Sequence, residues 1–126
     1  MTFARRVFLT AGIYGLIVIT PQFFLEAKTS RDFPPPITHP EFYYGFVATA
    51  LAWQVVFLVI GNDPARYRPL MPVAALIEKF VFGAAVPVLY AQGRVSGLML
   101  FFAGIDVLLG LLFLESWRRT KPAPAA

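Results

Sequence analysis

Residues 72–91 read PVAALIEKFVFGAAVPVLYA. The stretch is apolar except for the adjacent pair Glu78 and Lys79 near its middle. At 1.5 Å per residue, a helix of this length spans about 30 Å, the thickness of the hydrocarbon core of a bilayer. A charge at that depth costs about 2.5–3.5 kcal/mol on insertion scales, so it normally has a partner or a function. The stretch therefore predicts a transmembrane helix that contains a polar site.

Residues 7–25, 42–61 and 96–114 form three further apolar stretches of similar length. The chain has 126 residues, of which 58% are hydrophobic, above the fraction in an ordinary soluble domain. Strands are disfavoured because the stretches lack period-2 alternation and would need a closed barrel. The sequence predicts an all-α membrane protein, an antiparallel four-helix transmembrane bundle that forms a single domain over residues 1–119.

Basic residues are distributed unevenly between the two sides of this predicted bundle. Three lie on one side, Lys28, Arg31 and Arg94. The other side collects Arg5, Arg6, Arg66, Arg68, Arg118, Arg119 and Lys121. The positive-inside rule then places both termini in the cytoplasm and predicts a multi-pass protein of the bacterial inner membrane. Because the basic residues flank membrane segments, the net charge of +4 indicates the lipid bilayer as partner and no nucleic acid.

Two connecting segments are rich in proline. Residues 26–41 contain Pro34, Pro35, Pro36 and Pro40, which predicts an extended, polyproline-like outer loop without helix. Residues 120–126 are rich in proline and alanine and are predicted to be a disordered tail. Within the helices, small residues predict close contacts between helix backbones, at Ala11, Gly15, Ala48, Ala52, Gly83, Ala84, Gly104 and Gly110.

Each predicted helix places one polar side chain at a similar depth. Counted from the flanking arginines, Tyr14, Gln54, Glu78 and Asp106 fall within about one to two helical turns of each other. Trp53 and Lys79 lie beside this layer. The side chains of adjacent residues in an α-helix point about 100° apart. Glu78 and Lys79 are therefore not expected to point directly at the same partner residue.

Two arrangements follow for the charges of this layer. In one, Glu78 faces Gln54 and Tyr14 while Lys79 turns toward Asp106; in the other, Glu78 shares a proton with Asp106. The three ionised groups sum to −1, and an excess carboxylate in a low dielectric tends to hold a proton.

The polar layer supports three hypotheses about function. In the first, Tyr14, Trp53, Gln54, Glu78, Lys79 and Asp106 line a pocket for a lipophilic or protonatable small molecule. In the second, the protein is an accessory subunit of a larger membrane complex or a homo-oligomer, and its charges are assembly contacts or simply hold the helices together. In the third, a lipid-modifying enzyme uses Glu78 or Asp106 as general acid or base. The sequence favours binding over catalysis and names no catalytic residue.

Other sequence signals carry less chemistry. The chain has no cysteine and no nucleotide-binding, HExxH or Ser/His/Asp pattern, so we expect no cofactor. His39 is the only histidine, and its neighbours Asp32 and Glu41 lack metal-ligand spacing, so no metal site is expected. Arg66 and Arg68 flank the inner membrane face and are candidates for contact with anionic lipid head groups.

Four short runs carry a resemblance to a known group of proteins. They are residues 42–46 (FYYGF), 51–54 (LAWQ), 63–69 (DPARYRP) and the pair Glu78-Lys79. In these runs the chain resembles small uncharacterised bacterial membrane proteins, loosely DoxX-like. The resemblance implies a four-helix bundle in the inner membrane and supplies no substrate. The four-helix plan is also similar to the core of sterol-isomerase-type membrane proteins, which use buried acids.

Overall fold

The computed structural model describes residues 1–125, and 78% of the chain is helical with no strand in that part. The prediction of an all-α fold is confirmed. Four helical spans are long and apolar enough to cross a membrane. They are Phe3–Phe24, Pro40–Asn62, Arg68–Ala91 and Leu98–Arg119.

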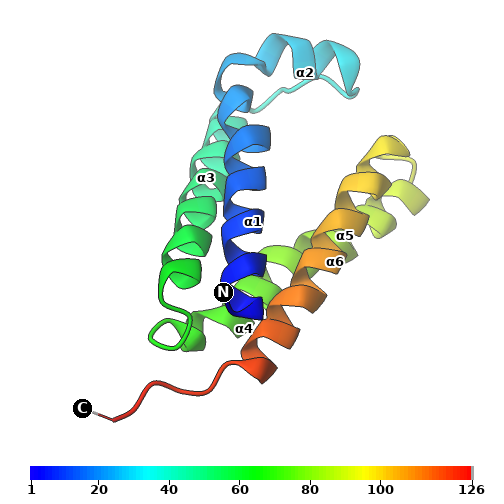
Figure 1. Ribbon diagram of the computed structural model, residues 1–126. Coiled ribbons are helices and arrows are strands. Elements are labelled where there is room, and N and C mark those ends of the chain that lie inside the picture. Colours follow the sequence, from blue (N-terminus) through cyan, green and yellow to red (C-terminus); the bar gives the residue numbers. More distant parts are fainter. Residues whose placement is uncertain (126) are drawn as a thin grey trace.

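The spans contain several helix types. The first consists of α1 (Phe3–Ile19) and the 3₁₀ turn η1 (Thr20–Phe24), the second of α3 (Pro40–Asn62) and the fourth of α6 (Leu98–Arg119). The third begins with the 3₁₀ turn η2 (Arg68–Leu70) and α4 (Met71–Val73) and continues through the π-helix η3 (Ala74–Lys79) into α5 (Phe80–Ala91). Consecutive spans run in opposite directions, so that the start of α1 and the end of α6 lie at the same end of the molecule (Figure 1).

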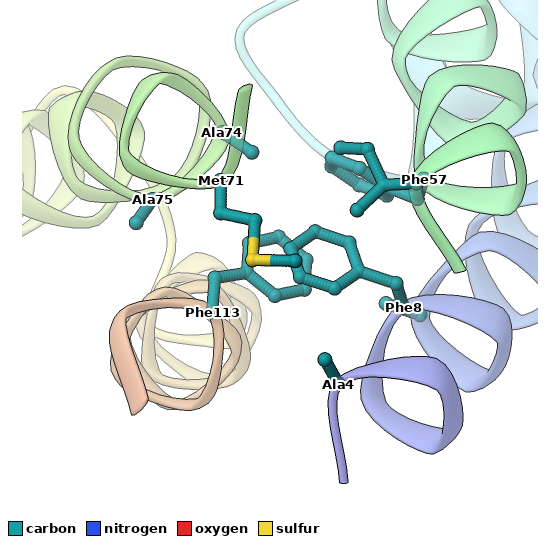
Figure 2. Packing of buried hydrophobic residues seen from close by; sticks show 9 residues of the cluster. Ala4, Phe8, Phe57, Met71, Ala74, Ala75 and Phe113 are labelled. Atoms are coloured by element: carbon teal, nitrogen blue, oxygen red, sulfur yellow. The ribbon is translucent and has the colours of Figure 1, made fainter. Parts of the chain in front are cut away.

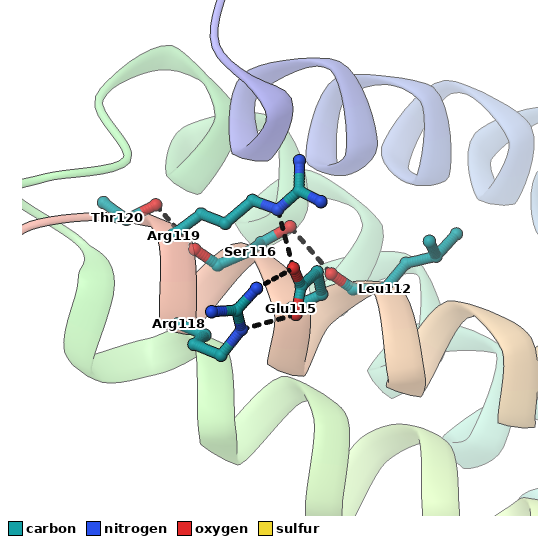
Figure 3. A network of polar contacts seen from close by, with 6 residues as sticks. All are labelled: Leu112, Glu115, Ser116, Arg118, Arg119 and Thr120. Carbon is teal, nitrogen blue, oxygen red and sulfur yellow. Dashed lines mark hydrogen bonds and ion pairs between the residues drawn. The ribbon is translucent and has the colours of Figure 1, made fainter.

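Two helices extend beyond the predicted apolar stretches because polar side chains support their ends. At the start of α1, the side chain of Thr2 accepts a hydrogen bond from the backbone N–H of Arg5 at 3.2 Å, a typical N-cap. At the end of α6, Glu115 accepts hydrogen bonds of 2.6 Å from both Arg118 and Arg119 (Figure 3). Pairs at this spacing stabilise the last turn, and the two arginines also favour the negative end of the helix dipole.

The prediction of an extended outer loop is wrong for its first half. Residues Glu26–Asp32 form the helix α2, and residues 33–39 between α2 and α3 contain bends without helix. The first half contains no proline, and Lys28 pairs with Asp32 one turn later at 2.6 Å, which lowers the pKa of that carboxyl group. Pro34 then ends the helix because the residue before a proline is forced out of the helical region.

The predicted tail is only partly described. Residues 121–125 contain no helix, and residue 126 lies outside the described residues.

The four spans associate as two pairs held by small residues. In the α1–α3 pair, a Cβ atom on Gly12 would lie 2.9 Å from the backbone oxygen of Gln54. In the α5–α6 pair, a Cβ atom on Gly110 would lie 2.4 Å from the ring of Phe80. Such close approach explains the glycines at these helix contacts. Gly104, which was also predicted to lie at a contact, has no neighbouring side-chain or backbone atom within 4 Å of its Cβ position.

The two pairs meet at the end of the molecule that carries both termini. There Phe8 stacks on Phe113 with ring centroids 4.2 Å apart, and Phe57 packs edge-on against Phe113 at 4.9 Å. Met71 and Ala74 complete this buried cluster (Figure 2). Toward the other end the α5–α6 pair leans away from the α1–α3 pair (Figure 1).

A candidate ligand-binding cavity between the helix pairs

A cavity of about 440 Å³ lies between the two helix pairs. Drug-sized ligands occupy pockets of about 300–1,000 Å³, so the volume suits a small organic molecule. The walls come from α1, η1, α2, α3, η3, α5, α6 and the segment 33–35 that follows α2. Its polar lining residues are Tyr14, Gln22, Thr29, Tyr43, Gln54, Glu78, Lys79, Ser96 and Asp106.

Three charged residues of η3 and α6 form one cluster at the end of this cavity nearer the aromatic core, and we refer to them as the triad. The Nζ atom of Lys79 lies 3.2 Å from Oε2 of Glu78 and 3.3 Å from Oδ1 of Asp106. The three side chains are 7%, 15% and 19% exposed for Lys79, Glu78 and Asp106, respectively. Buried charges are tolerated when they are paired. Lys79 therefore turns toward Asp106, as the first of the two predicted arrangements has it. The other half of that arrangement, with Glu78 facing Gln54 and Tyr14, stays a prediction.

The π-helix explains how adjacent residues both reach the triad. The backbone N–H of Phe80 bonds to the carbonyl of Ala75, five residues earlier, instead of four. This wider turn brings the side chains of successive residues closer in direction than the about 100° of an α-helix. Glu78 and Lys79 consequently both line the cavity. No sequence signal predicted this turn.

The hydrogen bonding of the triad is incomplete. Lys79 donates to Oδ1 of Asp106, but its contact with Glu78 lacks hydrogen-bond geometry. Among residues 1–125, Oε2 of Glu78 is a buried oxygen without a hydrogen-bond donor. On its other side the Lys79 ammonium lies 5.4 Å from the centre of the Phe57 ring, which connects the triad to the aromatic core.

The α1–α3 pair supplies Tyr14 and Gln54 to the same cavity. Gln54 is buried, and its Nε2 donates to the carbonyl of Ala50 at 2.8 Å. Its carboxamide lies against Gly15, where a Cβ atom would come within 1.7 Å of Oε1. The glycine therefore leaves the space that this carboxamide occupies, and a side chain there would displace it. The structure thus brings Tyr14, Gln54, Glu78, Lys79 and Asp106 to one cavity.

The remaining candidate residues lie elsewhere. Trp53 does not line the cavity and packs instead near the ring of Phe57, with centroids 6.2 Å apart. Arg68 donates to the carbonyl of Thr120 at 2.6 Å and lies over the ring of Trp117 at 4.6 Å. Arg66 lies near Tyr67 and is exposed. Both arginines belong to the end of the molecule where the termini lie, and their contact with lipid head groups stays a prediction.

The sequence did not predict the wall of the cavity that lies away from the triad. Phe33, Pro34 and Pro35 follow α2 and line the cavity together with Val95 and Ser96 from the turn between α5 and α6. The hydroxyl of Tyr43 donates to the carbonyl of Gln22 at 2.6 Å and joins α3 to η1 on the same side. The prolines predicted that residues 34–36 are not helical. That residues 33–35 line the cavity depends on contacts between elements far apart in the chain, which the sequence does not show.

Comparison of the chain with models of protein families, with curated proteins and with solved structures finds no match.

Proposed function

We propose that this protein spans a bacterial inner membrane four times and binds a lipophilic or protonatable small molecule in the cavity between its helix pairs. Support for the membrane comes from the outward helix faces. Ile17 on α1 is 69% exposed, and Phe101 on α6 is 62% exposed. Large apolar patches are rare on monomeric soluble proteins. Further large apolar side chains are exposed on all four spans, including Ile13, Val55, Val59, Ile77, Val81, Val88, Leu108 and Leu111.

The orientation we propose places both termini in the cytoplasm. The end that carries them also carries seven of the basic residues counted above, and cytoplasmic segments of membrane proteins are enriched in lysine and arginine. The resemblance to DoxX-like proteins agrees with a four-helix bundle in the inner membrane. That this chain is related to them is part of the proposal.

The observation that carries the binding function is the triad at the end of a largely apolar cavity. Phe46, Phe82 and Phe102 contribute aromatic walls, while Glu78 and Asp106 contribute charge at one end. An apolar pocket with a few convergent polar groups is the usual form of a small-molecule site. Assembly contacts are the weaker alternative because they require at least one charge to point outward, and all three charges of the triad are largely buried.

Photolabelling tests this function. The protein is placed in lipid nanodiscs with an uncharged alkyl diazirine, irradiated and analysed by mass spectrometry for labelled residues. We expect labelling of Phe82 on the cavity wall as well as of lipid-facing Leu111. Ala50→Phe should fill the cavity and suppress labelling of Phe82, whereas Ala52→Phe, which adds the same ring to an exposed position of α3, should not. Equal labelling of Phe82 in both variants would contradict a ligand cavity.

A further inference from the structure

The triad carries an excess of negative charge. Of the described residues that line the cavity, only Glu78, Lys79 and Asp106 are charged at neutral pH. With one ammonium against two carboxylates, the ionised set sums to −1. In a low dielectric this excess is costly, and either a proton or a cation from a ligand removes it.

The triad also has more hydrogen-bond acceptors than donors. An ammonium group offers three donors, whereas each carboxylate offers two oxygens with about four lone-pair sites. Lys79 uses one donor on Oδ1 of Asp106 and leaves Oε2 of Glu78 without a donor. Gln54 carries two N–H donors on Nε2, and one of them is engaged by the carbonyl of Ala50. A head group that brings both a positive charge and N–H donors would complement the site on both counts.

The shape of the cavity is consistent with a head group joined to an apolar body. Along the first span the lining runs from Tyr14 on α1 to Gln22 on η1, eight positions later, which corresponds to about 12 Å at the helical rise per residue. Between these ends the wall presents Val18, Ile19 and Phe46. Aromatic rings such as that of Phe46 are also compatible with cations, because their faces attract positive charge.

We infer that the ligand of this cavity is a lipophilic amine, bound with its protonated nitrogen at the triad and its apolar body against the aromatic walls. The inference rests on the proposed function and adds the chemical class of the ligand. A carboxylate head group would instead meet two like charges, and a hydroxyl group would supply a donor but no compensating charge.

Three photoreactive probes with one alkyl diazirine chain and different head groups test this inference. The heads are a primary amine, a hydroxyl and a carboxylate, and each probe is used on the full-length protein in nanodiscs at pH 7. For each probe, the labelling of Phe82 in the wild-type protein is divided by the labelling of Phe82 in the Ala50→Phe variant. This ratio corrects for differences between the probes in how strongly they partition into the membrane. We expect the ratio for the amine to exceed that for the hydroxyl by about tenfold, as for one charge-assisted contact, and the carboxylate to give the lowest ratio.

Two variants at the triad make the test specific. Asp106→Asn and Glu78→Gln each remove the excess charge, so either should reduce the amine preference toward that of the hydroxyl probe. Glu41→Gln makes the same chemical change at an exposed residue outside the cavity and should retain the preference. Having two triad variants keeps the test available if one of them does not fold.

The possible results distinguish failure of the amine inference from failure of the proposed ligand cavity. Cavity labelling that is equal for all three heads, or strongest for the carboxylate, would overturn the amine inference and leave the ligand cavity standing. Absence of Phe82 labelling with every probe would remove the cavity function and the amine inference together. Amine preference that survives in both Asp106→Asn and Glu78→Gln would also overturn the inference, because the preference would then come from another source.

Discussion

Lys79 on η3 and Asp106 on α6 are 27 residues apart in the chain, and the lysine Nζ lies 3.3 Å from the aspartate Oδ1. The same ammonium lies 3.2 Å from Glu78 and 5.4 Å from the centre of the Phe57 ring. A single buried cation therefore connects the third span, the fourth span and the aromatic core. This position makes Lys79 important for stability, whereas the two carboxylates around it are partly redundant with each other.

Removing the ammonium should destabilise the protein strongly. In Lys79→Met, two buried carboxylates lose their only cation, and breaking a buried ion pair in this way costs about 3–5 kcal/mol. Unfolding by sodium dodecyl sulfate, followed by circular dichroism in mixed micelles, measures the change. Adding Glu78→Gln and Asp106→Asn to the same chain should restore much of the loss, since no uncompensated charge remains. A Lys79→Met protein as stable as the wild type would show that the ion pairs contribute nothing.

Removing one carboxylate should have a much smaller effect. Glu78→Gln leaves Lys79 paired with Asp106, and Asp106→Asn leaves it paired with Glu78, so both proteins should fold. We expect each to unfold within about 1 kcal/mol of the wild type, the usual size of one net hydrogen bond. Expression level, gel filtration and the same unfolding titration provide the measurement. If both substitutions abolish folding, the polar layer serves to hold the helices together and the ligand-site hypothesis loses its main support.

Gly12 should tolerate no side chain at the α1–α3 contact. A Cβ atom there would lie 2.9 Å from the backbone oxygen of Gln54 and 2.7 Å from the side chain of Leu58, so Gly12→Ala must push the helices apart. Overpacking of this kind costs about 1–3 kcal/mol. Gly104→Ala is the matched control because its Cβ would meet no atom within 4 Å, and it should be neutral or slightly stabilising. Equal stability of the two variants would contradict the close helix contact.

Single cysteines can test the proposed orientation, because the chain contains no cysteine of its own. Thr38→Cys lies in the outer segment and Ala123→Cys in the tail after α6, and both positions are exposed. With intact bacterial spheroplasts, a membrane-impermeant maleimide should label Thr38→Cys and should label Ala123→Cys only after permeabilisation. The opposite pattern would invert the topology, and equal labelling of both cysteines in intact spheroplasts would contradict four crossings.

Much of the architecture could be predicted from the sequence because it depends on local properties. Apolar stretches such as residues 72–91 are long enough for helices that could cross a bilayer. The few polar residues within each stretch can be identified directly in the sequence. Counting residues from the arginines was sufficient to predict that Tyr14, Gln54, Glu78 and Asp106 share a depth, and all four line one cavity. A helix has a fixed rise per residue, so depth follows from position in the chain.

The features that the sequence did not reveal depend on contacts between distant elements. Whether the helix pairs close or diverge depends on where bulky rings such as those of Phe8 and Phe113 meet, and they meet at one end only. The π-helix that contains both Glu78 and Lys79 lies against α6, and no pattern in the sequence predicted it. The amino-acid sequence alone thus determined four apolar helices and the positions of the polar residues along them. Tertiary structure decided that these residues surround a cavity, because only packing between helices sets the space between them.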